Sequence, residues 1–320
     1  MIVPQKMHLA NIPTPVEIHK FKSHKLLIKR DDLTGMELSG NKIRKLEYLI
    51  HQAKKQKADI VFTDGGEQSN HARATVIAAA KAGIKSKLFL WGSDKTIADG
   101  NLFLDKIFGA EISFLTKKDF MRVNEIMFEE RMKLVEKGKK VYVIPEGGST
   151  TLGIWGYISF MQEINEQIDL KKISGIMSAC GSGGTAAGLL VGAALLKRKL
   201  KIYAVNVLYS KEIIKKKILQ LAEGCILDYK LPCELDDKNL EIIDGYSTEG
   251  YKNISDDKIA LIKQLAVSTG ILLDPAYTGK AFKAYYDNFI VKNKGKENLF
   301  IHTGGLYGIF GKRKQYLKVK

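Results

Sequence analysis

The sequence predicts an α/β protein in which open, mostly parallel β-sheets are covered by helices on both faces. Short apolar segments alternate with segments of helical periodicity along most of the 320 residues, as strands and crossover helices do in such sheets. Glycine-rich turns follow several of the expected strands, where α/β proteins bind ligands. The hydrophobic fraction of 45% supports a large core in one or two domains, and no internal repeat or low-complexity linker divides the chain.

The first part of the chain is expected to be irregular over residues 1–20, because it contains Pro4, Pro13 and Pro15. The elements expected next are a strand at 26–30, a turn at 31–35 and a helix from 42 to about 57. Further strands are expected at 59–63, 85–91, 111–115 and 141–144. Helices are expected between them at 69–82, 101–108 and 118–136.

The second part of the chain continues the same alternation up to a less regular region at 224–253, which contains Pro232 and several acidic residues. Before that region, strands are expected at 173–179 and 202–208, and helices from near 153, at 184–196 and at 211–223. After it, we expect a helix at 255–268, an apolar segment at 271–275, a helix from 278 and a last strand at 298–302.

The net charge of +16 raises the possibility of a nucleic-acid-binding protein. Only 7 of the 51 basic residues are arginine, however, and arginine is the residue that base readout and phosphate forks favour. The lysines are spread along apparent helix surfaces, and the only dense cluster near an end is the tail at 311–320. We therefore expect a lysine-rich solvated surface and no nucleic-acid partner.

Targeting and metal signals are missing from the sequence. No apolar segment has the length of a membrane span, and residues 1–10 lack the apolar centre of a signal peptide, so a cytoplasmic protein without a membrane partner is expected. The three cysteines contain no Cys-x-x-Cys and the six histidines show no metal-ligand spacing, so neither a disulfide framework nor a metal site is predicted. Cys180 is interpreted as a small buried residue.

The segment around Lys42 carries the first candidate site. Ser39 and Asn41 are cap-type residues before a helical apolar pattern, so Lys42 is expected in the first turn. The helix dipole opposes a cation there and lowers the pKa of an amine, and a neutral amine is what Schiff-base chemistry requires. Lys45 lies on the same face and could bind an anion beside Lys42. From this segment alone, two solvated lysines are an equally open interpretation.

The turn after the 59–63 strand has paired glycines followed by Ser69, Asn70 and His71 at a helix start, which suits a carboxylate. The turn at 180–185 offers backbone amides and two hydroxyls, which suit a phosphate. It loosely matches a dinucleotide motif, but the next strand ends at Asn206 instead of the acid that would bind the ribose. A monophosphate cofactor is therefore favoured over the alternative, an NAD-dependent oxidoreductase.

Three other turns are polar, at 145–153, 274–280 and 301–305, and each is a weak signal alone. Tyr277 in the second could be an ordinary core tyrosine, and His302 in the third could be a structural histidine.

Together, these segments resemble the D-cysteine desulfhydrase and 1-aminocyclopropane-1-carboxylate (ACC) deaminase family of pyridoxal-phosphate enzymes, which have the tryptophan synthase β-like fold (fold type II). The resemblance covers nearly the whole chain, and its segments occur in family order at 29–32, 39–49, 68–71, 181–188, 270–280 and 301–305. It implies two open, mostly parallel three-layer α/β/α domains, with residues 46–156 forming the smaller one. Residues 1–45 and 157–320 would form the larger, cofactor-binding domain, and the protein would be a homodimer.

The resemblance also implies roles for individual residues. Lys42 would form the Schiff base with pyridoxal phosphate, Asn70 would hydrogen-bond the phenolic oxygen of the cofactor, and Thr303 would lie near its pyridine nitrogen. The cofactor phosphate would be held by Lys45, Ser182, Gly183, Gly184 and Thr185. Catalysis would use Lys42, Ser69 and Tyr277, and an amino-acid substrate would contact Ser69, His71, Tyr251 and Tyr277.

The reaction implied is α,β-elimination of D-cysteine or a related β-substituted amino acid. Lys42, with Ser69 or a tyrosine, would remove a proton, the β-thiol would leave as sulfide, and hydrolysis would give pyruvate and ammonia. ACC deaminases are similar but carry a glutamate after the Asp-Pro-x-Tyr tyrosine and a leucine before the final Gly-Gly, where this chain has Thr278 and Thr303. Two hydroxyls near the pyridine nitrogen would favour elimination of thiolate. The alternatives are an ACC deaminase, forming 2-oxobutanoate and ammonia, and an unassigned pyridoxal-phosphate lyase of the same family.

Two acids depart from the family pattern. Glu67 stands at a position that is usually apolar, and Asp64 lies nearby; they could select a substrate with an extra amine or could face solvent. The region 245–253 matches the family only loosely. In the phosphate turn, Gly183→Asp is expected to set an anion against the phosphate.

Overall fold

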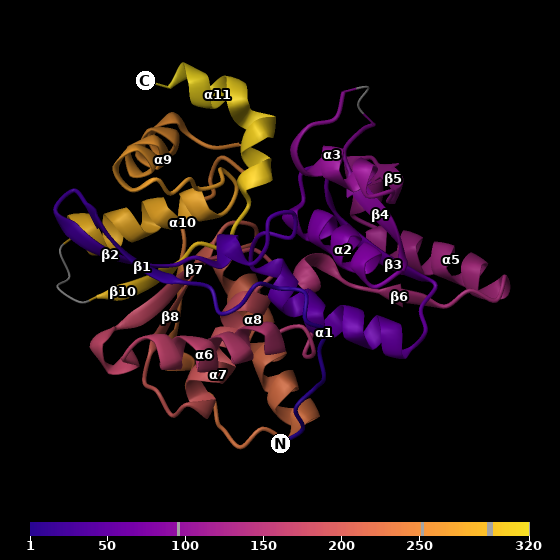
Figure 1. Cartoon of the computed structure of the whole chain (residues 1–320), viewed down its shortest axis with the longest axis horizontal. Coiled ribbons are helices and arrows are strands. Elements are labelled where there is room, and N and C mark those ends of the chain that lie inside the picture. The colour runs from indigo at the N-terminus through magenta and orange to yellow at the C-terminus, as the bar shows by residue number, and fades with distance from the viewer. Residues whose placement is uncertain (95–96, 251–252, 293–296, 320) are drawn as a thin grey trace.

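The computed structural model of the protein describes residues 1–94, 97–250, 253–292 and 297–319, which are organised around two β-sheets (Figure 1). The six-stranded sheet has the order β1 (Val16–Phe21), β2 (His24–Lys29), β10 (Asn298–Ile301), β7 (Gly175–Cys180), β8 (Lys201–Asn206) and β9 (Leu240–Ile243). The four-stranded sheet has the order β5 (Glu111–Leu115), β4 (Lys85–Trp91), β3 (Ile60–Gly66) and β6 (Val141–Val143). All described pairs are parallel except β1 with β2, which confirms the predicted mostly parallel α/β class.

Helices cover both faces of the six-stranded sheet because its central strands are apolar on both sides. Every residue of β7 is buried. One face packs on α6 (Trp155–Gln167), α7 (Gly184–Leu195) and α8 (Lys211–Tyr229). The other packs on α9 (Asp256–Thr269) and α10 (Thr278–Tyr285), which lie on the opposite side of the strands from α6 and α7 in Figure 1.

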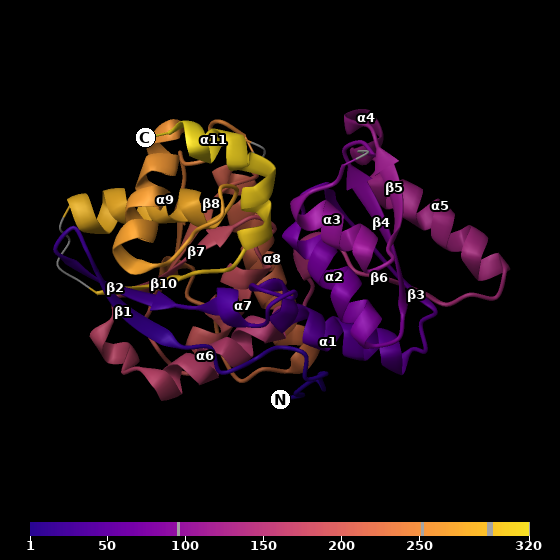
Figure 2. The same ribbon diagram turned by 45° about the horizontal axis from the view of Figure 1, so that its top comes forward.

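The four-stranded sheet is also covered on both faces. One face packs on α1 (Lys42–Lys55), α2 (Asn70–Lys81) and α3 (Gly100–Ile107), and the other packs on α5 (Val123–Glu136). Figures 1 and 2 show this sheet beside the six-stranded one, and α1 contacts both α2 and α6. The boundaries predicted at 45/46 and 156/157 stay predictions.

Edge elements differ most from the sequence-based expectation. Residues 1–20 were predicted to be irregular, but β1 pairs with β2 as an antiparallel edge strand. Within 224–253, α8 continues to Tyr229, and β9 adds a second edge strand. Both edge strands have partly exposed side chains and therefore little apolar periodicity. The basic tail includes a further short helix, α11 (Arg313–Lys318).

One interior segment also departs from the prediction. The expected helix at 118–136 is interrupted, because α4 (Lys117–Phe120) ends before α5 begins. The apolar segment at 271–275, for which neither a helix nor a strand was predicted, forms neither. Instead, the Asp274 carboxylate accepts hydrogen bonds from the backbone amides of Ala276, Tyr277 and Thr278, so it caps the start of α10.

The described residues contain no helix with the length and apolar character needed to cross a membrane. The same part of the chain contains no cluster of three or more His, Cys, Asp or Glu side chains suited to a metal ion. The candidate site lies at the carboxyl ends of the strands. The segments that follow β3, β6, β7, β8 and β10 converge on one cavity.

Candidate active site

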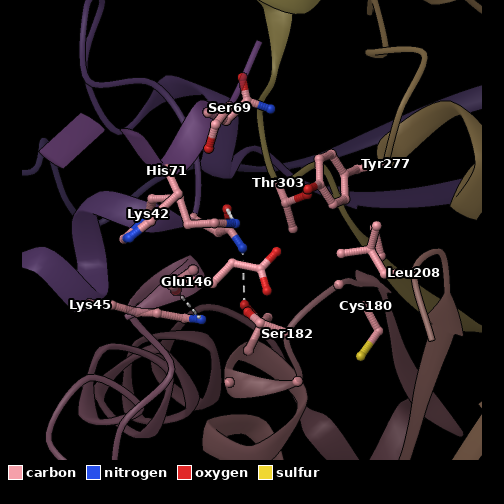
Figure 3. A pocket seen from close by; sticks show the side chains of 18 of the residues that line it. Lys42, Lys45, Ser69, His71, Glu146, Cys180, Ser182, Leu208, Tyr277 and Thr303 are labelled. Atoms are coloured by element: carbon pink, nitrogen blue, oxygen red, sulfur yellow. Dashed lines mark hydrogen bonds between the residues drawn. The ribbon is translucent and has the colours of Figure 1, made fainter. Parts of the chain in front are cut away.

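Nearly every residue that the sequence predicted for the site lines one cavity (Figure 3). The residues that were predicted from the sequence and that line the cavity are Lys42, Lys45, Ser69, Asn70, His71, Ser182, Gly183, Gly184, Thr185, Tyr277 and Thr303. Tyr251 was also predicted to contact the substrate, but it lies outside the described residues. The lining residues that sequence reasoning did not assign to the site include Asn41, Glu146 and Leu208.

Lys42 is held in the cavity by the turn that precedes α1. Gly40 has a φ of +109°, and a methyl group on it would come within 2.6 Å of the Thr303 carbonyl oxygen, so only glycine allows this approach. The amide of Asn41 donates to the same carbonyl at 3.1 Å. α1 begins at Lys42 as expected and ends at Lys55, slightly earlier than predicted.

The expected capping by Ser39 or Asn41 is wrong. Asn41 is helical and its side chain makes no capping hydrogen bond, while the Ser39 hydroxyl donates to the Asp32 carbonyl at 2.8 Å. The Lys42 Nζ donates instead to Asn41 Oδ1 at 2.9 Å. Burial lowers the pKa of the Lys42 amine to about 8, against the opposing influence of the Asp274 and Glu146 carboxylates. The lowered pKa agrees in direction with the expectation, although burial and not the helix dipole is its main cause, and the reactivity of Lys42 stays a prediction.

Lys45 provides a buried cation at the glycine-rich turn. Its Nζ donates to the Gly147 carbonyl at 3.0 Å and to Ser149 Oγ at 3.3 Å. No ion pair links it to a carboxylate of the described residues. Burial, and then the charge of Lys42, hold the pKa of Lys45 well below its usual range. An anion bound at the turn would supply the missing counter-charge.

The glycine-rich turn joins β7 to α7. Gly183 has a φ of +90° and precedes the first residue of α7, so backbone amides of the helix start face a possible anion. A methyl group on Gly184 would come within 2.7 Å of Lys45 Nζ, which places the ammonium directly over the turn. A side chain on Gly183 would instead meet Ile218 and Ile214 of α8. The expectation that Gly183→Asp would set an anion against the phosphate is therefore corrected.

The start of α2 forms another wall of the cavity. Ser69 caps this helix by accepting a hydrogen bond from the amide of Ala72 at 3.1 Å. Asn70 is oriented by Asn101, a residue that the sequence did not nominate. The Asn101 amide nitrogen donates to Asn70 Oδ1 at 2.9 Å and to the Gln68 carbonyl at 2.9 Å. With its oxygen engaged in this way, Asn70 keeps its amide nitrogen as the donor for a ligand.

His71 lines the cavity as a neutral imidazole. Thr63 has one hydroxyl proton, which it donates to the Ile144 carbonyl at 2.7 Å. The 2.9 Å contact between His71 Nε2 and the Thr63 oxygen must then be donated by the histidine. Burial also lowers the pKa of His71 well below its usual range. Substrate contact by His71 stays a prediction, and its Nδ1 is buried without a hydrogen-bond partner.

Thr278 and Thr303 differ in position although the sequence paired them. Thr303 lines the cavity, but Thr278 does not, because its hydroxyl donates to Asp274 Oδ1 at 2.6 Å. The expectation for Thr278 is thus corrected, whereas the approach of the Thr303 hydroxyl to the pyridine nitrogen stays a prediction. The aromatic ring of Tyr277 also lines the cavity, with its centroid 5.7 Å from Lys42 Nζ.

The acids near the site also differ from expectation. Glu67 lines a neighbouring pocket that shares Asn70 with the cavity, and Asp64 is buried at the end of β3. Glu146, which follows β6, lines the cavity itself. The Gly147-Gly148 pair that follows Glu146 was the sequence signal that could have indicated a tight turn at the site, since both glycines adopt positive φ.

These residues fit pyridoxal phosphate, the cofactor implied by the sequence. The cofactor presents an aldehyde, a phosphate and a phenolic oxygen. Lys42 offers a low-pKa amine for the aldehyde, and Lys45 is a buried cation without a described carboxylate partner beside the turn. Asn70 offers an oriented amide donor for the phenolic oxygen.

Comparison with known proteins agrees with this fit. The family described as pyridoxal-phosphate dependent enzyme matches residues 7–304. The bifunctional D-cysteine desulfhydrase/ACC deaminase of Arabidopsis thaliana is 39% identical over 95% of this chain and 79% of its own length. A D-cysteine desulfhydrase of Klebsiella pneumoniae is 34% identical over 95% of both chains. The crystal structure of an ACC deaminase homologue superposes with a TM-score of 0.91 at 35% identity, covering 99% of this chain and 97% of that one. The chain belongs to the family of pyridoxal-phosphate dependent enzymes that contains ACC deaminases and D-cysteine desulfhydrases, and pyridoxal phosphate is its cofactor.

Proposed function

We propose that the protein is a lyase that converts D-cysteine, or a related β-substituted amino acid, to pyruvate, ammonia and sulfide. The observation that carries this proposal is the surroundings of Thr303, discussed below. ACC deaminase activity is the second candidate, because the Arabidopsis relative is named for both activities. The predicted homodimer and cytoplasmic location belong to this proposal; the first rests on the family resemblance and the second on the sequence pattern.

Lys42 is the group proposed to move the α-proton of the substrate. Its pKa of about 8 leaves roughly a tenth of the amine neutral at pH 7, against less than a thousandth for an ordinary lysine. A base with a pKa near the working pH is the most effective proton acceptor. Bound pyridoxal phosphate supplies the electron sink that stabilises the charge left at the α-carbon.

The start of α2 is proposed to hold the substrate carboxylate. The N-terminus of a helix carries unsatisfied amides and a partial positive charge, and α2 begins at Asn70 on the cavity wall. Ser69 Oγ accepts the capping bond from Ala72, so its own proton stays available for a substrate oxygen. A substrate carboxylate bound at Ser69 would lie in the same cavity as Lys42 and Tyr277, which supports this proposal.

The end of the cavity near Thr303 supports thiolate elimination over ring opening. If the pyridine nitrogen lies there, it meets a hydroxyl, whereas a pyridinium needs a carboxylate partner. The nearby Asp274 carboxylate is occupied by three backbone amides and the Thr278 hydroxyl. A weaker electron sink suits a good leaving group such as thiolate better than a carbon that must be protonated.

The test assays purified holoenzyme with D-cysteine, L-cysteine, β-chloro-D-alanine and ACC under the same conditions. Sulfide and pyruvate report elimination, and 2-oxobutanoate reports ring opening. We expect pyruvate from at least one β-substituted alanine to form faster than 2-oxobutanoate from ACC, and Lys42→Ala to abolish both reactions. Faster formation of 2-oxobutanoate would replace the proposal with the ACC deaminase alternative.

A further inference from the structure

Glu146 presents a carboxylate to the active-site cavity. It follows Pro145 at the end of β6, and the positive φ angles of Gly147 and Gly148 form the turn that carries it. In Figure 3 its side chain extends into the space bordered by Lys42, Ser182 and Thr303. The Tyr209 hydroxyl, which follows β8, donates to Glu146 Oε2 at 2.9 Å and fixes the position of the carboxylate.

Glu146 makes no direct ion pair among the described residues, although its charge acts on Lys42 through space. Lys42 Nζ is directed to Asn41 Oδ1, and Lys45 Nζ to the Gly147 carbonyl and Ser149. Burial and the neighbouring Glu146 charge raise the pKa of Asp64 to about 7, so Asp64 is partly protonated near neutral pH. A carboxylate that makes no direct ion pair in a partly water-excluded cavity favours a cationic ligand group.

The Glu146 turn lies against the wall that is proposed to bind the substrate carboxylate. Thr63 ties the two together, since it donates to the Ile144 carbonyl and accepts from His71. A methyl group on Gly148 would come within 3.6 Å of His71 Cε1, so the turn packs directly on the first turn of α2. Ser69 and Glu146 therefore line the same cavity from adjoining walls.

We propose that Glu146 makes this enzyme selective for amino acids that carry a second ammonium group on the side chain, with 2,3-diaminopropionate as the smallest eliminating substrate. The inference rests on the proposed β-elimination. Lys42 takes the α-proton, the Cβ–N bond breaks, and its electron pair leaves with the nitrogen as neutral ammonia. Hydrolysis then gives pyruvate and a second ammonia, so one water is consumed and no oxidant or reductant is needed. By stabilising the ammonium form, Glu146 keeps the nitrogen in the state in which it can leave.

The binding test separates selectivity from turnover by using side chains without a β-leaving group. Holoenzyme is titrated calorimetrically with 2,4-diaminobutyrate and with norvaline, which has a methyl group where the diamine has its ammonium; both enantiomers of each are used. We expect wild type to prefer the diamine by about tenfold to a hundredfold, the range for a charge-assisted contact. Glu146→Gln should lose at least about tenfold of that preference while its norvaline affinity stays unchanged.

Glu67→Gln is the matched control, since Glu67 lines the neighbouring pocket, and it should keep the preference. Thermal unfolding of each variant checks that the fold is intact. Absence of the preference in wild type, or its persistence in Glu146→Gln, would overturn the assignment. Turnover then separates the two proposals. Pyruvate from D-cysteine without any diamine preference removes this inference alone. A Glu146-dependent preference without pyruvate from any β-substituted substrate removes the proposed elimination, and with it 2,3-diaminopropionate as a substrate, and leaves only the selectivity assigned to Glu146.

Discussion

Gly184→Ala offers a sharp test of the phosphate site, because the structure defines what the added methyl group would meet. It would come within 2.4 Å of Ser149 Oγ and 2.7 Å of Lys45 Nζ. Both atoms are the ends of flexible side chains and can move away, so the fold should survive. Moving them, however, breaks the contacts by which Ser149 Oγ meets Lys45 Nζ and the Gly184 amide.

The expected loss is one charge-assisted contact between Lys45 and the cofactor phosphate. Hydrogen bonds to charged groups contribute about 1.5–3 kcal/mol, which corresponds to about a 10- to 150-fold rise in the cofactor dissociation constant. The free energy of unfolding of the apoprotein should change less, because alanine is favoured over glycine in a helix by about 1 kcal/mol and offsets part of the crowding.

The assay is equilibrium dialysis of apoprotein against pyridoxal phosphate, paired with urea denaturation of the apoprotein. Gly192→Ala in the same helix is the matched control, because its methyl group would meet the buried Met161 side chain at 2.6 Å, outside the cavity lining. We expect Gly192→Ala to lower stability and leave the dissociation constant unchanged. A Gly184→Ala variant that binds the cofactor as tightly as wild type would refute the placement of the phosphate at this turn.

Three further predictions address other parts of the site. Borohydride reduction of holoenzyme should label Lys42, and a label on another lysine would contradict the assignment. Apoenzyme should react with the cofactor aldehyde at a rate that rises with pH and levels off above about pH 9, because an amine with a pKa of about 8 is almost fully deprotonated there. A rate that still rises past about pH 10 would also contradict the assignment. Asn101→Asp should raise the cofactor dissociation constant about tenfold, because an acceptor facing Asn70 Oδ1 turns the amide donor away from the phenolic oxygen; unchanged affinity would show that Asn101 does not orient Asn70. Arg44→Met should lower the free energy of unfolding by about 3–5 kcal/mol in urea denaturation, because it leaves Asp31 without its buried guanidinium and Glu163 with Lys29 alone; a loss below about 1 kcal/mol would show that the pair is replaceable.

The sequence alone was sufficient for the features that local patterns encode. Burial on both faces makes the centre of a parallel strand apolar, and the strand at 85–91, with its apolar residues at 88–91, was located at its observed bounds. Chain order and glycine-rich turns were enough to nominate Lys42, Asn70 and the loop after β7, because strand ends in parallel sheets meet at one edge. The same signals indicated the family, which the comparisons confirm.

Tertiary structure decided the features that depend on residues far apart in the sequence. The edge strands β1 and β9 have partly exposed side chains, so pairing with a neighbour defines them and periodicity does not. Thr278 and Thr303 looked equivalent in sequence, but the first turns to Asp274 and only the second reaches the cavity. Glu146 and Asn101 enter the site only because β6 and α3 pack beside β3 and α2. Sequence periodicity reports whether a residue is buried, whereas the direction of a side chain at a strand end and the charge it meets there are set by the packing of separate segments.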